Sequence, residues 1–137
     1  MIENNKRLVR RLVEEIWNQG NLDVIDEIVT SDYVPHDPGW PEEISGREGL
    51  REKLSSIRRA FGDLEVTVED LIAESDRVVV RWRMKGTHQA DFMGIMPTRL
   101  DIALVGMSMH RMDNGQIAET WDGYDSLGLM KQLGVVP

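Results

Sequence analysis

Few ionisable side chains of this sequence are expected to lie among apolar side chains, and Asp125 is the strongest candidate among them. In a strand over residues 116–124, alternation places Ile117 and Trp121 on one face, and Asp125 follows on the same parity. Desolvation among apolar side chains raises the pKa of a carboxylate. Asp125 is therefore a candidate general acid/base. Aspartate is also a favoured N-cap, and Ser126 begins a short helical pattern, so helix capping is the alternative role.

Imidazole is the other group that exchanges protons near neutral pH, and the chain has three histidines. His36 precedes an aspartate in a proline-rich loop, where it is either oriented for proton transfer or held by rigid loop geometry. His88 falls on the face of Trp82 in a strand over residues 78–88, and is either a proton donor in a pocket or a histidine bonded to the backbone. For His110, in a strand that leads to a hairpin, we expect surface exposure.

Other kinds of chemistry lack support in the sequence. The absence of cysteine excludes disulfides, thiolate nucleophiles and thiolate metal sites. No closely spaced histidine pair suggests a metal, and no glycine-rich phosphate loop or Gly-x-Ser-x-Gly motif suggests a nucleotide cofactor or a serine hydrolase, so we expect neither metal nor cofactor. The net charge of −8 disfavours nucleic acid as a partner. No signal-peptide pattern or bilayer-spanning apolar run occurs, so we expect a cytoplasmic protein without a membrane partner.

The elements that must position these residues are helices in the first half and strands in the second. Apolar residues at helical spacing predict helices over residues 8–17, 22–29 and 46–61. Alternating patterns predict strands over 64–69, 78–88, 100–112 and 116–124, and a helical turn is expected at 127–133. The proline-rich stretch 31–41 predicts a short edge strand segment followed by a loop. This order predicts an α+β fold of one domain over residues 1–137, in which the sheet curls around three helices and leaves a cavity between them.

Two features of the strands extend this prediction. We expect Trp121, Trp82 and Met107 to form walls of the cavity, and the apolar loop 92–97 to form its lid or mouth. The run 102–107 is apolar on both faces, so that one face is free to serve the interior while the other needs a cover. A second subunit is the simplest cover, and we therefore expect a homodimer packed sheet to sheet.

Ordered short segments along almost the whole chain resemble the SnoaL-like polyketide cyclases, also called ester cyclases, of the NTF2-like superfamily. The segments are Asn18-Gln19-Gly20-Asn21, Tyr33-Val34-x-His36-Asp37-Pro38, Gly46-Arg47-Glu48-Gly49-Leu50, Ala60-Phe61-x-Asp63-Leu64, Asp76-Arg77-Val78-Val79-Val80-Arg81, Gly86-Thr87-His88, Phe92-Met93-Gly94, Pro97-Thr98, Gly115-Gln116-Ile117-Ala118-Glu119-x-Trp121, Asp125 and Gln132-Leu133-Gly134. Where the family usually continues Gly-Arg after Pro97-Thr98, this chain has Arg99-Leu100, a departure at the mouth of the pocket.

The resemblance implies a cone-shaped, mixed or antiparallel sheet around the helices, often in a dimer, with an internal pocket for a small apolar molecule. It also implies ring closure by intramolecular aldol condensation, or a related isomerisation, without metal or organic cofactor. The Trp-x-x-x-Asp segment carries the family's pocket aspartate to Asp125, and His36 and His88 match recurrent histidines. Tyr33 and Phe92 are then expected among the substrate-binding walls. The alternative function is a non-catalytic domain that binds a small molecule in the same pocket.

Overall fold

The computed structural model describes all residues 1–137. Its helical elements are α1 (Ile2–Arg11), the π-helix η1 (Leu12–Asn18), the 3₁₀-helix η2 (Leu22–Val24), α2 (Ile25–Ile28), α3 (Gly46–Ala60) and α4 (Ser126–Gln132). Its strands are β1 (Val29–His36), β2 (Glu65–Glu74), β3 (Arg77–Thr87), β4 (Asp101–Asp113) and β5 (Gln116–Tyr124). The predicted α+β order is confirmed, and Val29 starts β1 instead of ending the second helix.

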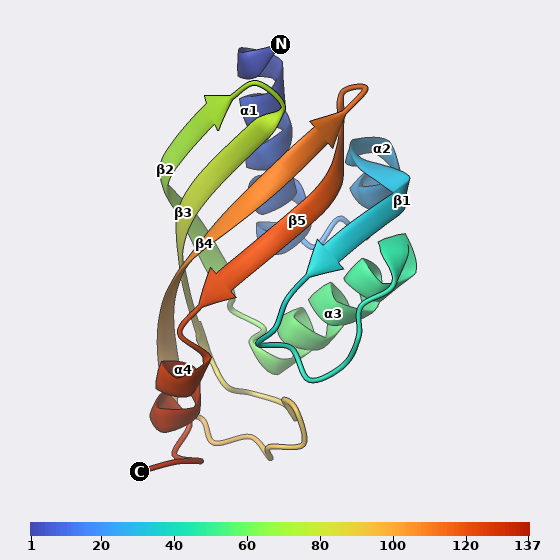
Figure 1. Ribbon diagram of the computed structural model, residues 1–137. Helices are drawn as coiled ribbons and strands as arrows, with labels where there is room; N and C mark the ends of the chain where they lie inside the picture. The colour runs from blue at the N-terminus through green and yellow to red at the C-terminus, as the bar shows by residue number, and fades with distance from the viewer.

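The five strands form one curved sheet with the order β1-β5-β4-β3-β2. Neighbouring strands are antiparallel, except that β1 pairs with β5 in parallel. The concave face of the sheet wraps around α1 and α3, while α4 and the loop before β4 lie at the opposite end from the N-terminus (Figure 1). The sheet is therefore mixed and closes around the helices, as the sequence predicted.

The first predicted helix changes its winding halfway along. Residues of α1 and η1 bury the expected apolar stripe, which includes Val9, Leu12 and Ile16, against the sheet. From Leu12 onwards the helix has π geometry, whose i→i+5 hydrogen bonds widen each turn. Gly20 then ends the helical segment with a φ of +71°, a conformation that favours glycine.

A β-bulge in β5 decides which side chains of this strand reach the interior. Across the β4–β5 pair, Met112 lies opposite Ile117 and Arg111 lies opposite Glu119, so Ala118 is an extra residue. The bulge reverses the alternation after Ile117. Unbroken alternation would place the later residues of β5 on the opposite faces, so the predicted orientation of these residues is wrong.

The convex face of the sheet carries apolar side chains in the open. Val105 and Met107 of β4 are 56% and 54% exposed, and Ile72 of β2 is 67% exposed. Met107 therefore does not form a wall of the cavity, because it alternates with the inward-facing Ser108 along a regular strand. Separately, the chain contains no helix with the length and apolar character needed to cross a bilayer.

Candidate active site

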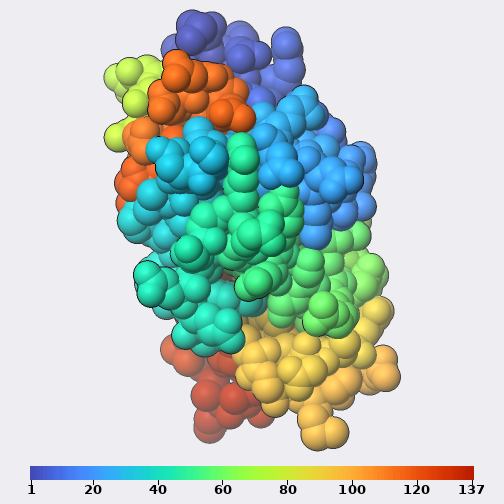
Figure 2. Space-filling view, turned by 90° about the vertical axis from the view of Figure 1, so that its right-hand side faces the viewer, coloured from blue at the N-terminus to red at the C-terminus, as the bar shows by residue number.

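A largely apolar cavity of about 100 Å³ lies between the concave face of the sheet, η1 and α3. Of its 28 lining residues, 20 are hydrophobic, so the interior withdraws a ligand from water. At one end the lining comes from the loop after β1, the loop before β4 and α4. These three segments meet at the surface in Figure 2, where they are drawn in teal, yellow and red. Three predicted walls, Trp82, Phe92 and Tyr33, line this cavity.

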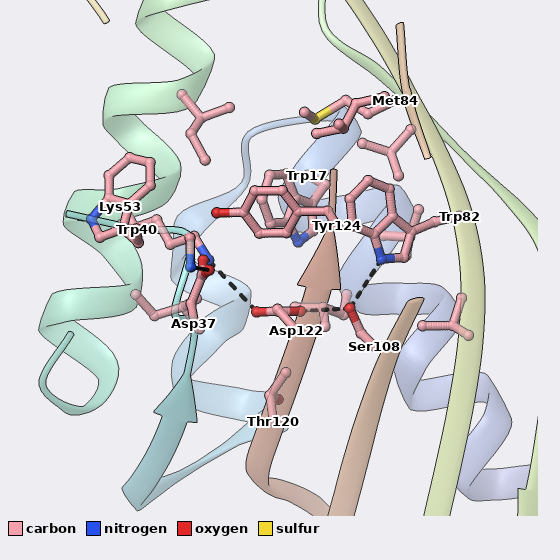
Figure 3. Close-up of a pocket in the computed structure, with 18 of the residues that line it drawn as sticks. Trp17, Asp37, Trp40, Lys53, Trp82, Met84, Ser108, Thr120, Asp122 and Tyr124 are labelled. Carbon is pink, nitrogen blue, oxygen red and sulfur yellow. Dashed lines mark hydrogen bonds and ion pairs between the residues drawn. The ribbon is translucent and has the colours of Figure 1, made fainter. Parts of the chain in front are cut away.

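Two carboxylates and one ammonium group meet inside this apolar wall (Figure 3). Lys53 of α3 pairs with Asp37 of the loop after β1, and its Nζ lies 3.6 Å from Oδ2 of Asp122 in β5. The exposed fractions of the three side chains are 7% for Lys53, 0% for Asp37 and 20% for Asp122. Only the paired arrangement makes such burial of charge tolerable.

A hydrogen-bonded chain of fixed direction orients Asp122. The indole N–H of Trp82 can only donate, and it donates to Ser108 Oγ at 3.0 Å. The Ser108 hydroxyl in turn donates to Asp122 Oδ1 at 2.5 Å. Oδ2 of Asp122 receives no hydrogen bond from the chain, so one oxygen of this carboxylate is held and the other is open.

A second polar group lies next to the carboxylates. Nδ1 of His110 is 2.7 Å from Thr120 Oγ1, and the ring is buried at the cavity wall. Burial lowers the pKa of His110 to about 4, against a smaller opposing effect of Asp122. Burial also raises the pKa of Tyr124 and of Tyr33, and the carboxylates of Asp37 and Asp122 add to both shifts. His110 is thus a neutral imidazole at neutral pH, and both phenols keep their protons.

The buried His110 makes the stability of the fold depend on pH. Its pKa falls from 6.5 to about 4 on folding, so the unfolded chain binds the proton more tightly. Stabilisation is complete above pH 6.5 and is lost as the pH falls towards 4, by about 3 kcal/mol. Urea unfolding of wild type and His110→Asn at pH 7 and pH 4.5 measures this contribution. We expect a smaller loss of stability in His110→Asn; equal losses in the two proteins would contradict the assignment.

The structure places Asp125 outside the cavity. Its side chain is exposed, and Oδ1 accepts the backbone N–H of Gly128 at 2.8 Å as the N-cap of α4. The capping alternative is therefore the role that the structure shows. The expectation that this carboxylate lies in an apolar pocket is wrong, because the bulge at Ala118 brings Asp122 into the interior in its place.

His36 and Trp121 also lie outside the cavity, on the convex face of the sheet. The His36 ring stacks on Trp121 with ring centres 5.2 Å apart, and its Nε2 is 2.7 Å from Glu119 Oε2. Arg77 covers the same indole at 5.7 Å. Trp121 is therefore a surface platform for charged and polar groups, and the expectation that it forms a cavity wall is wrong.

His88 is fully buried but supports the cavity from behind. The backbone N–H of Thr98 donates to Nδ1 at 3.1 Å, which leaves the proton of the neutral ring on Nε2. Nε2 has no hydrogen-bond partner in the chain. The ring packs against Phe61 and Phe92, whose own rings line the cavity. His88 therefore fixes the apolar loop before β4 and does not itself face the cavity.

Three polar residues of the site do not follow from the sequence pattern, and the reason is local for each of them. Lys53 interrupts the apolar stripe of its helix. The sequence pattern is the same for a buried lysine and for a lysine at the edge of the stripe whose ammonium group reaches the solvent. Asp122 lies on the face that strict alternation turns outwards. His110 is followed by Arg111 on a strand that leads to a hairpin, a pattern typical of an exposed position, and the expected surface exposure of His110 is wrong because its side chain is buried. The one usable signal was the set of three polar residues that share one face of β5 by alternation, Thr120, Asp122 and Tyr124.

No set of three or more histidine, aspartate or glutamate side chains converges in a way that could hold a metal ion. The two carboxylates of the cavity are instead bridged by the ammonium group of Lys53. The chemistry that these side chains can perform themselves is proton transfer at Asp122 in surroundings of low polarity.

Comparison with known proteins agrees with this architecture. Residues 7–133 match the family model described as SnoaL-like polyketide cyclase. TsrD from Streptomyces laurentii superposes with a TM-score of 0.88 at 25% identity, over 98% of this chain and 97% of that chain. AclR from Streptomyces galilaeus, a proposed hydroxylase, gives 0.87 at 28% identity over 100% and 89%.

IdmH from Streptomyces antibioticus, a proposed polyketide cyclase, gives a TM-score of 0.81 at 31% identity over 96% of this chain and 99% of that chain. No curated protein sequence gives a significant match. The family match covers almost the whole chain, and the structural likeness covers the same residues. The chain therefore belongs to the SnoaL-like polyketide cyclase family.

Proposed function

We propose that this protein is a cofactor-independent enzyme that closes a ring in a small, largely apolar carbonyl compound by an aldol-type condensation, with Asp122 as general acid/base. The observation that carries the proposal is the open Oδ2 of Asp122 inside an apolar cavity, with Oδ1 fixed by Ser108. A carboxylate that is oriented through one oxygen presents the other to a proton in a defined direction.

Asp122 suits this role better than the other buried carboxylate. Asp37 uses both of its oxygens within the chain, since Oδ2 pairs with Lys53 and Oδ1 accepts the backbone N–H of Gly39 at 3.2 Å. Its side chain is also completely inaccessible, whereas that of Asp122 is 20% exposed. Only Asp122 combines an available oxygen with access to the cavity.

In the proposed reaction, Asp122 Oδ2 removes a proton from the carbon next to a carbonyl group. The C–H electron pair moves into the carbon–carbon bond and the carbonyl π pair moves to oxygen, which gives an enolate. The enolate carbon then attacks a second carbonyl carbon of the same molecule, and a ring-closing carbon–carbon bond forms. The second oxygen takes the proton back from Asp122. No atom is lost, so this step isomerises its substrate.

The cavity wall favours a neutral, compact substrate. Its two carboxylates exceed its one ammonium group, so a further negative charge would be repelled. Aromatic side chains, among them Trp17, Trp40 and Trp82, offer flat apolar surfaces in the same cavity as these charged groups. Confinement in about 100 Å³ brings the two ends of a flexible chain together, which raises their effective concentration.

The experiment that tests the proposal needs no knowledge of the natural substrate. Proton removal next to a carbonyl is measured in D₂O by NMR as the loss of α-proton signals from cyclohexanone, acetophenone and 2-tetralone. We expect the protein to accelerate exchange of at least one ketone over buffer alone. Ketones that bind, as seen by their chemical-shift changes, without faster exchange would instead support the non-catalytic binding domain.

We further propose that the convex face of the sheet pairs with a second copy of the chain. The exposed Val105 and Met107 lie side by side on β4, and a self-complementary sheet face would cover them in a symmetric dimer. Light scattering is expected to give a dimer mass for wild type and a monomer mass for the variant Val105→Glu/Met107→Glu. Leu127→Glu, at a similarly exposed position on α4, is expected to leave the dimer intact. A monomeric wild type would contradict this proposal.

A further inference from the structure

Lys53 occupies a position of α3 where the pattern of the helix calls for an apolar residue. Its neighbours on the buried stripe are Leu50, Leu54 and Ile57, and its own side chain is 7% exposed. Burying an ammonium group is costly, and an apolar pair in place of a buried ion pair is often as stable or more stable. Stability alone therefore gives a weak reason for a lysine here.

The ammonium group has more donors than the chain satisfies. It carries three N–H donors, and within the chain only Asp37 accepts a hydrogen bond from it. Asp122 Oδ2, at 3.6 Å, is close enough for charge attraction but beyond hydrogen-bond distance. The indole ring of Trp40, 5.8 Å away, adds a cation–π contact but no acceptor oxygen. The remaining N–H donors of Lys53 are therefore free at the cavity wall.

The surrounding charges determine what this nitrogen can do. Two carboxylates lie within 4 Å of Nζ, so Lys53 acts here as a paired cation and charge-assisted hydrogen-bond donor. Asp37 uses its second oxygen on Gly39, which fixes the carboxylate and with it the position of the ammonium group. The open donors are therefore preorganised to bind an oxygen atom of a ligand, next to the open oxygen of Asp122.

From this juxtaposition we infer that Lys53 is a second catalytic residue: its ammonium group binds the substrate carbonyl oxygen and stabilises the negative charge that develops on it. Asp37 is the positioning residue for Lys53. The inference rests on the proposed function. When Asp122 takes the proton, one negative charge moves from its carboxylate to the enolate oxygen, and the same ammonium group faces both positions. The substrate class is accordingly a neutral ketone or ester whose enolisable carbon lies next to the bound carbonyl.

The test uses 4-nitrophenol as a coloured mimic of an enol, whose ionised form absorbs visible light. The variant Lys53→Gln/Asp37→Asn removes one positive and one negative charge, so the net charge of the cavity is unchanged. At a given pH, we expect the ratio of ionised to neutral bound probe to be about 10- to 100-fold higher in wild type, the effect of one hydrogen bond to a charged group. The matched control Lys85→Gln/Glu65→Gln, an exposed pair on β3 and β2, is expected to equal wild type.

A second measurement needs no variant. In ¹⁵N-labelled wild type, the side-chain ammonium signal of Lys53 is expected to shift when 4-nitrophenol is added, and that of Lys85 is expected to stay. Equal ionisation of the bound probe in wild type and Lys53→Gln/Asp37→Asn, an unmoved Lys53 signal, or no binding by wild type would each overturn the inference.

The proposed function and this inference fail in different ways. If Asp122→Asn exchanges α-protons as fast as wild type while the Lys53 effect on the probe is present, Asp122 is not the base and the oxygen-binding role of Lys53 stands. If Asp122→Asn abolishes exchange and the Lys53 effect is absent, the base assignment stands and this inference is wrong.

Discussion

Asp122→Asn is expected to lower the rate of α-proton removal by about 10²- to 10⁴-fold, the usual contribution of a positioned general base. An asparagine side chain keeps the oxygen that accepts the Ser108 hydroxyl but has no carboxylate to take the proton. Affinity for a ketone should change little, because the apolar walls of the cavity are untouched. The rate of α-proton exchange in D₂O at saturating ketone separates this loss from a loss of binding.

The matched control for this variant is Asp125→Asn. Asparagine is as good an N-cap as aspartate, so α4 keeps its cap and the net charge changes by the same amount. Because Asp125 lies outside the cavity, its exchange rate should equal that of wild type. A wild-type rate in Asp122→Asn, or a large loss in Asp125→Asn, would contradict the placement of the acid/base.

Lys53→Met is expected to destabilise the protein by about 3–5 kcal/mol, the usual result of removing one partner of a buried ion pair. The reason is Asp37, whose side chain is 0% exposed and would lose its cationic partner. The remaining charge of Asp122 lies nearby and would add repulsion. Urea unfolding monitored by tryptophan fluorescence measures the change in the free energy of unfolding.

The double variant Lys53→Met/Asp37→Asn separates loss of charge balance from loss of packing. The asparagine keeps an oxygen for the Gly39 N–H but carries no charge, so most of the lost stability should return. Arg51→Met, which removes a partner from the surface pair with Asp26, should cost less than about 1 kcal/mol. Equal stability of Lys53→Met and wild type would show that Asp37 does not depend on Lys53.

Regular periodicity explains what could be predicted from the sequence. The stripe of α3 and the alternation of β3 were assigned correctly, and Trp82 and Met84 line the cavity as that alternation requires. The order of helices and strands also fixed the curved sheet, because three amphipathic helices need one concave face to cover them. These patterns repeat over many residues, so a single exception does not hide them.

The candidate site could not be predicted in the same way, because one extra residue controls it. The bulge at Ala118 exchanges the two faces of β5, so that Asp122 enters the cavity and Trp121 leaves it. A one-residue shift of this kind leaves no trace in the apolar pattern of so short a strand. Lys53 and His110 were missed for a related reason: their burial depends on partners from other elements, Asp37 for the first and Thr120 for the second.

The most direct test of the account is a crystal structure of the protein with bound cyclohexanone. We predict that the ring lies in the cavity between the sheet and α3, with an α-carbon about 3–3.5 Å from Asp122 Oδ2, the distance of a reactive arrangement. Its carbonyl oxygen should accept a hydrogen bond from Lys53 Nζ. A ketone bound on the convex face near His36 and Trp121, or one held in the cavity with its carbonyl turned away from both residues, would contradict it.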